Sequence, residues 1–319
     1  MRKNILVTGG AGFIGSNLVE ALLKDERVGK VRVLDNLSTG LLSNIERFQA
    51  NHEFEFFEGD IRSYQDCIKA CNGMHLISHQ AALGSVPRSV KDPITTNDVN
   101  IGGTLNVFTA AKEVGISRVI YAASSSTYGD STNMPKVEHI IGNPLSPYAI
   151  TKYVNEMYAK VFHTLYNLEF IGFRYFNVFG PYQNPNGEYA AVIPIFVSAI
   201  LNNTPPLING DGSVSRDFTF VDNAVQANIL GLFTNNSDAV NQVYNVACGE
   251  STTLKQLYIY LTQIANSTLQ PNYGKPRQGD IPHSLADIEK IKTLLKYSPL
   301  IDVKEGLQKT LAWFKEQNV

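Results

Sequence analysis

A tyrosine and a lysine four residues apart carry the most evident chemistry of this sequence. Residues 146–152 read Ser-Pro-Tyr-Ala-Ile-Thr-Lys, and Ser146 followed by Pro147 predicts the start of a helix. On that helix Tyr148 and Lys152 share one face. A free tyrosine has a pKa of about 10, and lowering it by roughly three units takes about 4 kcal/mol, which nearby positive charges can supply. We therefore predict that Tyr148 is a base whose ionised form is favoured by the Lys152 cation.

A run of hydroxyl side chains precedes this pair. The predicted strand 119–123 is followed by Ser124, Ser125, Ser126 and Thr127. A hydroxyl at the carboxyl end of a parallel strand faces the crevice where ligands bind. We expect it to hydrogen-bond the reacting oxygen or to pass on its proton.

A glycine-rich turn follows the first predicted strand. Residues 8–15 read Thr-Gly-Gly-Ala-Gly-Phe-Ile-Gly and run into helical sequence. Glycines 9, 12 and 15 let backbone N–H groups approach a pyrophosphate, and the helix N-terminus adds partial positive charge. Asp35, at the end of the second strand, can accept hydrogen bonds from a ribose diol and would repel a 2′-phosphate, so NAD is favoured over NADP. The nicotinamide ring of NAD would add a second positive charge beside Tyr148.

Two later strand ends extend the predicted cofactor site. Asp60 and Ile61 follow the third strand, where this architecture commonly reaches the adenine, and Ala81 and Ala82 follow the fourth, where small side chains let a dinucleotide lie close. We assign both pairs of residues to the cofactor site because they follow successive strands in the expected order.

Alternating strands and helices must position these residues. Apolar runs at 5–7, 31–34, 54–57, 76–78, 119–123 and 170–173 alternate with helical patterns at 14–23, 98–113 and 148–166. The first half thus predicts an α/β fold, a doubly wound parallel Rossmann sheet over residues 1–180. Proline-rich sequence after Gly180 predicts a smaller C-terminal α/β substrate domain over 181–319. The strand-like run 243–247 predicts that about 214–250 rejoins the first sheet.

Composition excludes several classes of function. The 319 residues include 29 acidic and 27 basic side chains, which gives no broad basic field for nucleic acid or a membrane surface. Three cysteines and six histidines show no metal-ligand spacing, and no metal is expected. No apolar run reaches the roughly 18 residues that span a bilayer, so the expected location is cytoplasmic.

Taken together, these motifs resemble those of the extended short-chain dehydrogenase/reductase family, and specifically its UDP-hexose 4-epimerases. The matching segments are 8–15, 35–38, 124–129, 148–152, 174–177, 209–212, 216–218 and 277–280. The resemblance implies NAD-dependent inversion of C4 of a UDP-sugar through a transient 4-keto sugar, with NAD tightly held. It also implies a homodimer formed through the helices at 98–113 and 148–166. It extends the expected NAD contacts to the glycine turn's Phe13 and Ile14, and to Asn36, Ser38, Thr39, Gly40, Gln80, Tyr148, Lys152 and Tyr175.

The same resemblance assigns substrate residues. It makes Ser124 the catalytic hydroxyl and Ser126 an accessory one. The family's dehydratases carry an Asp-Glu pair where this chain has Ser125 and Ser126, so dehydration is not expected. UDP is expected to contact Asn177, Arg216 and Arg277, with weaker contacts from Asn209 and Asp280.

Two segments, 84–90 and 189–194, are similar to epimerases that prefer N-acetylated hexosamines. The family's sugar-pocket gate position falls on Ser284, where a bulky tyrosine would block a 2-acetamido group. These implications add Gly84, Ser85, Ala191 and Val192 to the expected substrate residues and favour UDP-N-acetylglucosamine and UDP-N-acetylgalactosamine.

Other functions stay open at this point. They are a UDP-glucose/UDP-galactose 4-epimerase, a UDP-uronate 4-epimerase or a UDP-glucuronate decarboxylase, since Arg88 could meet a carboxylate. A non-enzymatic alternative is an NAD-sensing regulatory protein, which would have no need of the Ser124, Tyr148 and Lys152 set.

Overall fold

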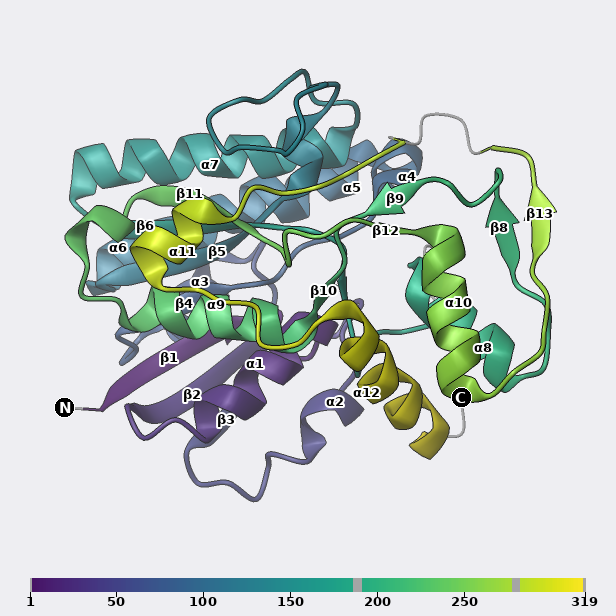
Figure 1. Cartoon of the computed structure of the whole chain (residues 1–319). Helices are drawn as coiled ribbons and strands as arrows, with labels where there is room; N and C mark the ends of the chain where they lie inside the picture. The colour runs from purple at the N-terminus through teal and green to yellow at the C-terminus, as the bar shows by residue number, and fades with distance from the viewer. Residues whose placement is uncertain (1, 186–190, 277–281, 318–319) are drawn as a thin grey trace.

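A seven-stranded parallel sheet forms the centre of the molecule. The computed structural model describes residues 2–185, 191–276 and 282–317, and the sheet order is β11-β6-β5-β4-β1-β2-β3 (Figure 1). The strands are β1 (Lys3–Thr8), β2 (Val28–Asp35), β3 (Phe54–Glu58), β4 (Leu76–His79), β5 (Arg118–Ser124), β6 (Glu169–Tyr175) and β11 (Gln242–Val246). The predicted α/β class and parallel sheet are confirmed.

Alternate strand residues build two apolar cores, one on each face of the sheet. Ile5 and Val7 of β1 belong to one core, and Leu6 between them belongs to the other. All three are fully buried, which explains why the strand reads as a continuous apolar run. Helices cover both faces: α1 (Phe13–Leu23) contacts α9 (Val221–Phe233), whereas α3 (Tyr64–Cys71) contacts α6 (Thr104–Val114), which meets α7 (Pro147–Tyr166).

The strand order sets the position of a ligand crevice. From β1 the chain first winds outward through β2 and β3, then crosses to β4 on the other side of β1. Connections therefore leave the carboxyl ends of β1 and β4 in opposite directions, and such a switch point leaves a crevice above the sheet.

The helix predicted at 98–113 differs from the expectation in its first half. Residues Asp98–Gly103 form a π-helix, η1, which continues into α6. Asn100 accounts for part of this widened turn. Its buried side-chain amide accepts a hydrogen bond from the Leu83 N–H at 2.8 Å and donates one to the Leu83 carbonyl at 3.1 Å. Gly103 also packs where a Cβ would lie 2.6 Å from Ile61 Cδ1. Such wide turns often occur at functional sites.

The second half of the chain forms small elements, most of them beyond one end of the sheet, whereas the helix Glu289–Leu295 packs against the last strand of the sheet. They are β7 (Val178–Phe179), α8 (Val192–Leu201), β8 (Leu207–Asn209), β9 (Ser215–Arg216), β10 (Thr219–Phe220), β12 (Thr252–Thr253), α10 (Leu254–Ala265), β13 (Asn272–Gly274), α11 (Glu289–Leu295) and α12 (Val303–Glu316). Between them, α9 and β11 return to the central sheet, and β11 is the strand expected near 243–247. Figure 1 shows β8, β13, α8 and α10 on the side away from β11.

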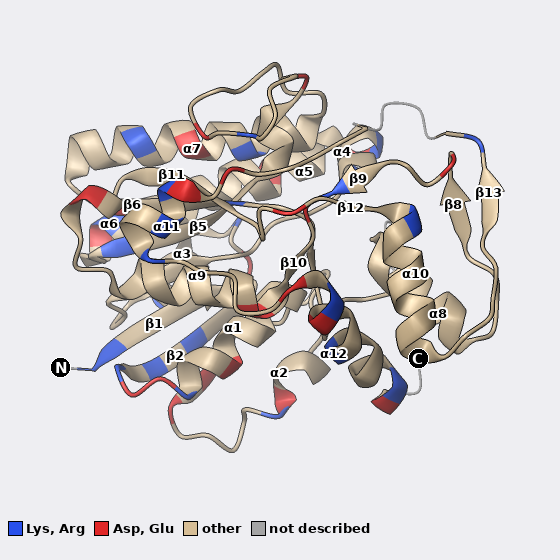
Figure 2. Cartoon of the chain, viewed as in Figure 1, with Lys and Arg blue, Asp and Glu red and all other residues tan. Residues whose placement is uncertain are grey.

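Short helical turns complete the chain. These are α2 (Ser43–Glu46), α4 (Val86–Lys91), α5 (Pro93–Asn97), η2 (Ser125–Tyr128) and η3 (Ser237–Ala239). Basic and acidic residues alternate over the elements without gathering on one of them (Figure 2). Among the described residues, no helix is both long and apolar enough to cross a membrane.

Candidate functional site

A cavity of about 580 Å³ opens at the carboxyl ends of the central strands. The whole predicted cofactor set lines it, together with three predicted catalytic side chains and part of the predicted substrate set. These lining residues are Gly9, Gly12, Phe13, Ile14, Gly15, Asp35, Asn36, Ser38, Thr39, Gly40, Asp60, Ile61, Gln80, Ala81, Ala82, Gly84, Ser85, Ser124, Tyr148, Lys152, Tyr175 and Asn177. The structure thus brings together residues that are spread over more than half of the chain.

The glycine turn forms the floor of this cavity at the start of α1. Gly9 has a φ of +71°, and a Cβ on Gly15 would lie 2.1 Å from the Gly9 carbonyl oxygen, so the turn requires glycine at both positions. Gly12 is the N-cap of α1, and the first turn of that helix carries no acidic side chain. The helix itself therefore places no negative charge at its N-terminus, which suits a pyrophosphate.

Asp35 stands at the rim where β2 ends. Its carboxylate is 9% exposed and accepts hydrogen bonds from the backbone N–H groups of Ala11 and Leu37, both at 2.9 Å. Burial raises the pKa of Asp35, and the two N–H donors act in the opposite direction. The carboxylate is thus fixed beside the glycine turn, with remaining lone pairs available to a ribose diol.

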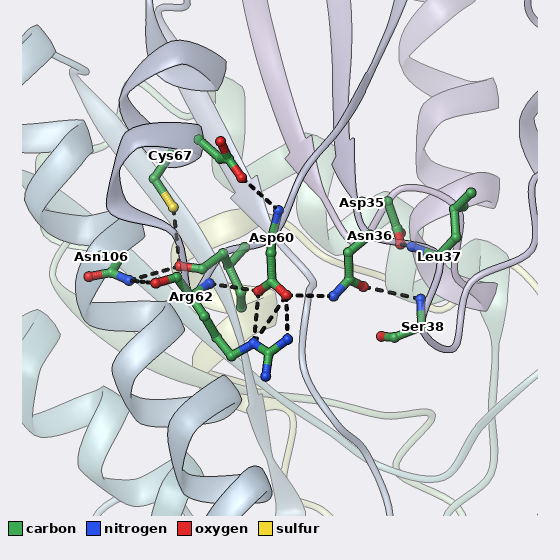
Figure 3. A network of polar contacts seen from close by, with 10 residues as sticks. Asp35, Asn36, Leu37, Ser38, Asp60, Arg62, Cys67 and Asn106 are labelled. Atoms are coloured by element: carbon green, nitrogen blue, oxygen red, sulfur yellow. Dashed lines mark hydrogen bonds and ion pairs between the residues drawn. The ribbon is translucent and has the colours of Figure 1, made fainter.

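Asp60 links the ends of β2 and β3 through a polar network (Figure 3). Arg62 forms an ion pair with its carboxylate at 2.6 Å, and the Asn36 amide donates to it at 2.9 Å. Hydrogen bonds from Arg62 lower the pKa of Asp60 to about 2. Asp60 is therefore an ionised carboxylate at the edge of the cavity, and it is already paired with Arg62.

The predicted catalytic residues meet above β5 and the first turn of α7. Ser146 caps α7 by accepting from the Ala149 N–H at 3.1 Å, as the sequence predicts. Lys152 Nζ donates to the Ala122 carbonyl at 2.8 Å and lies 5.9 Å from the centre of the Tyr148 ring. Ser124 Oγ accepts from the hydroxyl of Ser126 at 2.9 Å. Ser126 is thus behind Ser124 and not among the residues that line the cavity.

The electrostatics of this group differ from the sequence-based expectation. Burial raises the pKa of Tyr148, although the Ser124 hydroxyl counteracts the rise, and burial lowers the pKa of Lys152 to about 8. In the protein alone, Lys152 therefore does not bring the pKa of Tyr148 below its ordinary value. The physical reason is that the same desolvated surroundings penalise both the phenolate and the ammonium.

A buried histidine that sequence reasoning did not single out supports the cavity from below. His79 is 3% exposed and bonds Thr8 Oγ1 at 2.6 Å and Thr104 Oγ1 at 2.9 Å. The Asn155 amide on α7 donates to the same Thr104 hydroxyl at 3.2 Å. Burial lowers the pKa of His79 to about 3, so the ring is neutral. These hydrogen bonds join the strand that leads into the glycine turn to α7, the helix that carries Tyr148.

A second network holds the far wall. The Tyr175 hydroxyl donates to Gln80 Oε1 at 3.1 Å and accepts from the Asn228 amide at 2.7 Å. Asn228 comes from α9, which the sequence did not connect to the site. Val99, Val178 and Gln183 also line the cavity without having been predicted, because no local motif marks them.

The remaining predicted substrate residues that the structure describes are not among those that line this cavity. Arg216 and Ser284 are on adjacent segments, since Ser215 pairs with His283 in parallel and the Ser284 N–H donates to the Ser215 carbonyl at 3.1 Å. Asn209 ends β8, and Ala191 and Val192 begin α8. Arg277 and Asp280 lie outside the described residues. Within the described ranges, no group of three His, Cys, Asp or Glu side chains could hold a metal ion.

Comparison with known proteins places the chain in a family. Residues 5–247 match the model of the NAD dependent epimerase/dehydratase family. The chain belongs to this family. A putative UDP-glucose 4-epimerase from Methanocaldococcus jannaschii is 37% identical over 98% of this chain and 99% of that protein.

Solved structures of epimerases are similar over their whole length. The UDP-N-acetylglucosamine 4-epimerase from Methanobrevibacter ruminantium, in complex with UDP-N-acetylmuramic acid, has a TM-score of 0.93 and 42% identity over 99% of both chains. The UDP-glucose 4-epimerase from Thermotoga maritima, with UDP-glucose, has a TM-score of 0.92 and 35% identity over 99% of this chain and 100% of that one. As a member of the NAD dependent epimerase/dehydratase family, the protein is an NAD-dependent enzyme. Three features fit that cofactor: the glycine turn, the N-terminus of α1 with no acidic residue in its first turn, and the Asp35 carboxylate.

Proposed function

We propose that this enzyme inverts C4 of UDP-sugars and that UDP-N-acetylglucosamine and UDP-N-acetylgalactosamine are its substrates. The observation that carries the proposal is the opening of Ser124, Tyr148 and Lys152 into the same cavity as the glycine turn and Asp35. A base, a hydroxyl and a dinucleotide site in one crevice are what reversible oxidation of a sugar alcohol requires.

The side chains divide the work as follows. NAD, held by the glycine turn and Asp35, would supply the acceptor for a hydride from the sugar C4 and the donor that restores it. The ionised Tyr148 oxygen takes the proton of the 4-hydroxyl, while the Ser124 hydroxyl hydrogen-bonds the same sugar oxygen. After the resulting 4-keto sugar presents its opposite face, Tyr148 gives the proton back and C4 is inverted. Lys152, buried beside Tyr148, holds the ribose of the cofactor.

The proposed UDP anchors are Asn177, Arg216 and Arg277, with Asn209 and Asp280 contributing to the uridine and ribose. Arginine suits this task because its planar donors match phosphate oxygens. Ser284 is proposed as the gate beside the sugar 2-position, where a small side chain leaves room for an acetamido group. Its place on the segment adjacent to Arg216 supports this assignment.

A panel of UDP-sugars tests the proposal directly. The purified enzyme is supplied with the UDP-N-acetylhexosamine pair, the UDP-glucose/UDP-galactose pair and UDP-glucuronate, and the products are separated. Interconversion of the acetylated pair with the highest kcat/KM is expected. Turnover confined to the unacetylated pair would reject the gate, and turnover confined to the uronate, by epimerisation or decarboxylation, would favour a role for Arg88.

We also propose that two copies associate through α7. One stripe of this helix exposes Ile150, Met157, Val161 and Leu165, at helical spacing. The neighbouring α5 exposes Ile94, and α5 contacts α7. A contiguous apolar surface of this kind is typical of a self-complementary interface.

A further inference from the structure

A fully buried carboxylate joins the segments that carry the proposed substrate residues. Asp217 lies between β9 and β10 and is 0% exposed. It accepts hydrogen bonds from the Cys248 and Gly249 N–H groups, both at 3.0 Å, just beyond the end of β11. It also accepts from the Ala286 N–H at 3.3 Å, on a segment almost 70 residues away.

The segment that contains Ala286 runs as a strap, defined here as residues 282–288, from the outer part of the molecule back to α11 (Figure 1). On one side it bonds β9, through Ser215 N–H to the Pro282 carbonyl at 3.0 Å. On the other side it bonds Lys136, whose N–H donates to the Leu285 carbonyl at 2.7 Å. Ala286 is the residue of the strap that pairs with Lys136, and its own N–H is directed to Asp217.

Three proposed substrate positions therefore meet around this one residue. Arg216 precedes Asp217 directly, and Ser284 lies on the strap that Asp217 holds. The Asn177 amide, on a third segment, donates to the Asp217 backbone carbonyl at 3.0 Å. Asp217 thus contacts all three segments, in addition to the backbone hydrogen bonds that join the strap to β9.

We propose that Asp217 is a positioning residue for the nucleotide-sugar site, whose carboxylate fixes the strap against β9 and the end of β11. The proposal rests on the proposed function, because it assumes that Arg216 and Ser284 meet a UDP-sugar. The carboxylate matters because all three partners are N–H donors. An amide at this position would present an NH₂ group to at least one of them and leave it without an acceptor.

The test compares Asp217→Asn with Asp238→Asn, a matched control that removes one carboxylate from the exposed turn η3. For Asp217→Asn we expect KM for the UDP-sugar and the calorimetric Kd for UDP to rise about tenfold. The kcat is expected to change less than threefold, and the NAD content not at all. Hydrogen exchange of a peptide covering 282–288 should become faster in this variant only.

Unchanged KM and Kd for Asp217→Asn would overturn the proposal, and so would an equal loss of kcat and NAD content, which indicates a general structural role. If that variant does not fold, Ala286→Pro removes the N–H donor on the strap, while adding a ring and fixing φ there, and is expected to raise KM and Kd in the same way. Failure of the wild-type enzyme to bind UDP or turn over any UDP-sugar would instead reject the proposed function, and this proposal with it.

Discussion

The proposed role of Tyr148 is that of a base, although burial raises its pKa. We therefore expect Tyr148→Phe to fold and to keep its NAD, because the ring still packs, but to lose turnover by roughly 10²–10⁴-fold, the usual contribution of a positioned base. The measurement is kcat together with the NAD content of the purified protein. Tyr166→Phe, at the exposed end of the same helix, is the control and should remain active. A fully active Tyr148→Phe enzyme would remove this residue from the mechanism.

The buried His79 predicts a specific acid sensitivity. Its pKa is about 3 in the folded protein and about 6.5 when unfolded, so below pH 6.5 the unfolded chain takes up a proton that the folded chain does not. The stability that neutral His79 contributes is complete above pH 6.5 and is lost as the pH falls toward 3. The free energy of unfolding should decline by about 1.4 kcal/mol more per pH unit in the wild type than in His79→Gln. Equal slopes in denaturant titrations between pH 6 and pH 4.5 would contradict this reading.

Ser284 allows the proposed substrate preference to be tested by a single change. Ser284→Tyr is expected to lower kcat/KM for the acetylated pair at least tenfold, because the ring would occupy the space proposed for the acetamido group. Activity on UDP-glucose should be retained, which also serves as the internal control for folding. A variant that keeps its full activity on the acetylated sugars would end the gating argument.

At the scale of elements, the proposals give α7 two functions along its length. Its first two turns carry Tyr148 and Lys152, whereas most of the exposed apolar stripe lies on its later turns and ends with Leu165, 64% exposed. Light scattering after size exclusion should give twice the 35.2 kDa mass of the chain. Replacing Val161 and Leu165 together by glutamate is expected to give monomers, because two desolvated charges would face a like pair across the interface.

The control for that experiment is Leu300→Glu, which places a charge at an equally exposed leucine away from α7. It should leave the mass unchanged. A wild-type protein that is monomeric at micromolar concentration would reject the interface.

Elements with strong local signals could be predicted from the sequence. The strands of the central sheet, the glycine turn into α1 and the capped start of α7 follow from apolar runs, glycine spacing and Ser146-Pro147. The π-helix at Asp98–Gly103 could not, since its apolar pattern is the same as that of an α-helix and its cause is a tertiary contact from Asn100 to Leu83.

At the scale of the whole molecule, the dinucleotide side of the cavity was predictable and the opposite side was less so. Residues that follow strand ends in a parallel sheet reach one edge whatever the rest of the chain does, which is why Asp35, Ala81 and Ser124 line the same cavity. Gln183 reaches it, and Asn228 bonds its lining residue Tyr175, only through long-range packing of the segment after β7 and of α9. Periodicity and spacing carry no information about such contacts.

The return of β11 to the edge of the sheet has a practical consequence for anyone who wishes to divide this enzyme. A fragment cut after residue 180 keeps every glycine of the turn, but it lacks the strand that pairs with β6 and the helix α9 that packs beside α1. Phe173 and the rest of the β6 flank would then meet water along an unpaired edge, which favours aggregation. Residues 1–180 therefore do not form a module that a single cut can separate, and fusion proteins should keep the whole chain.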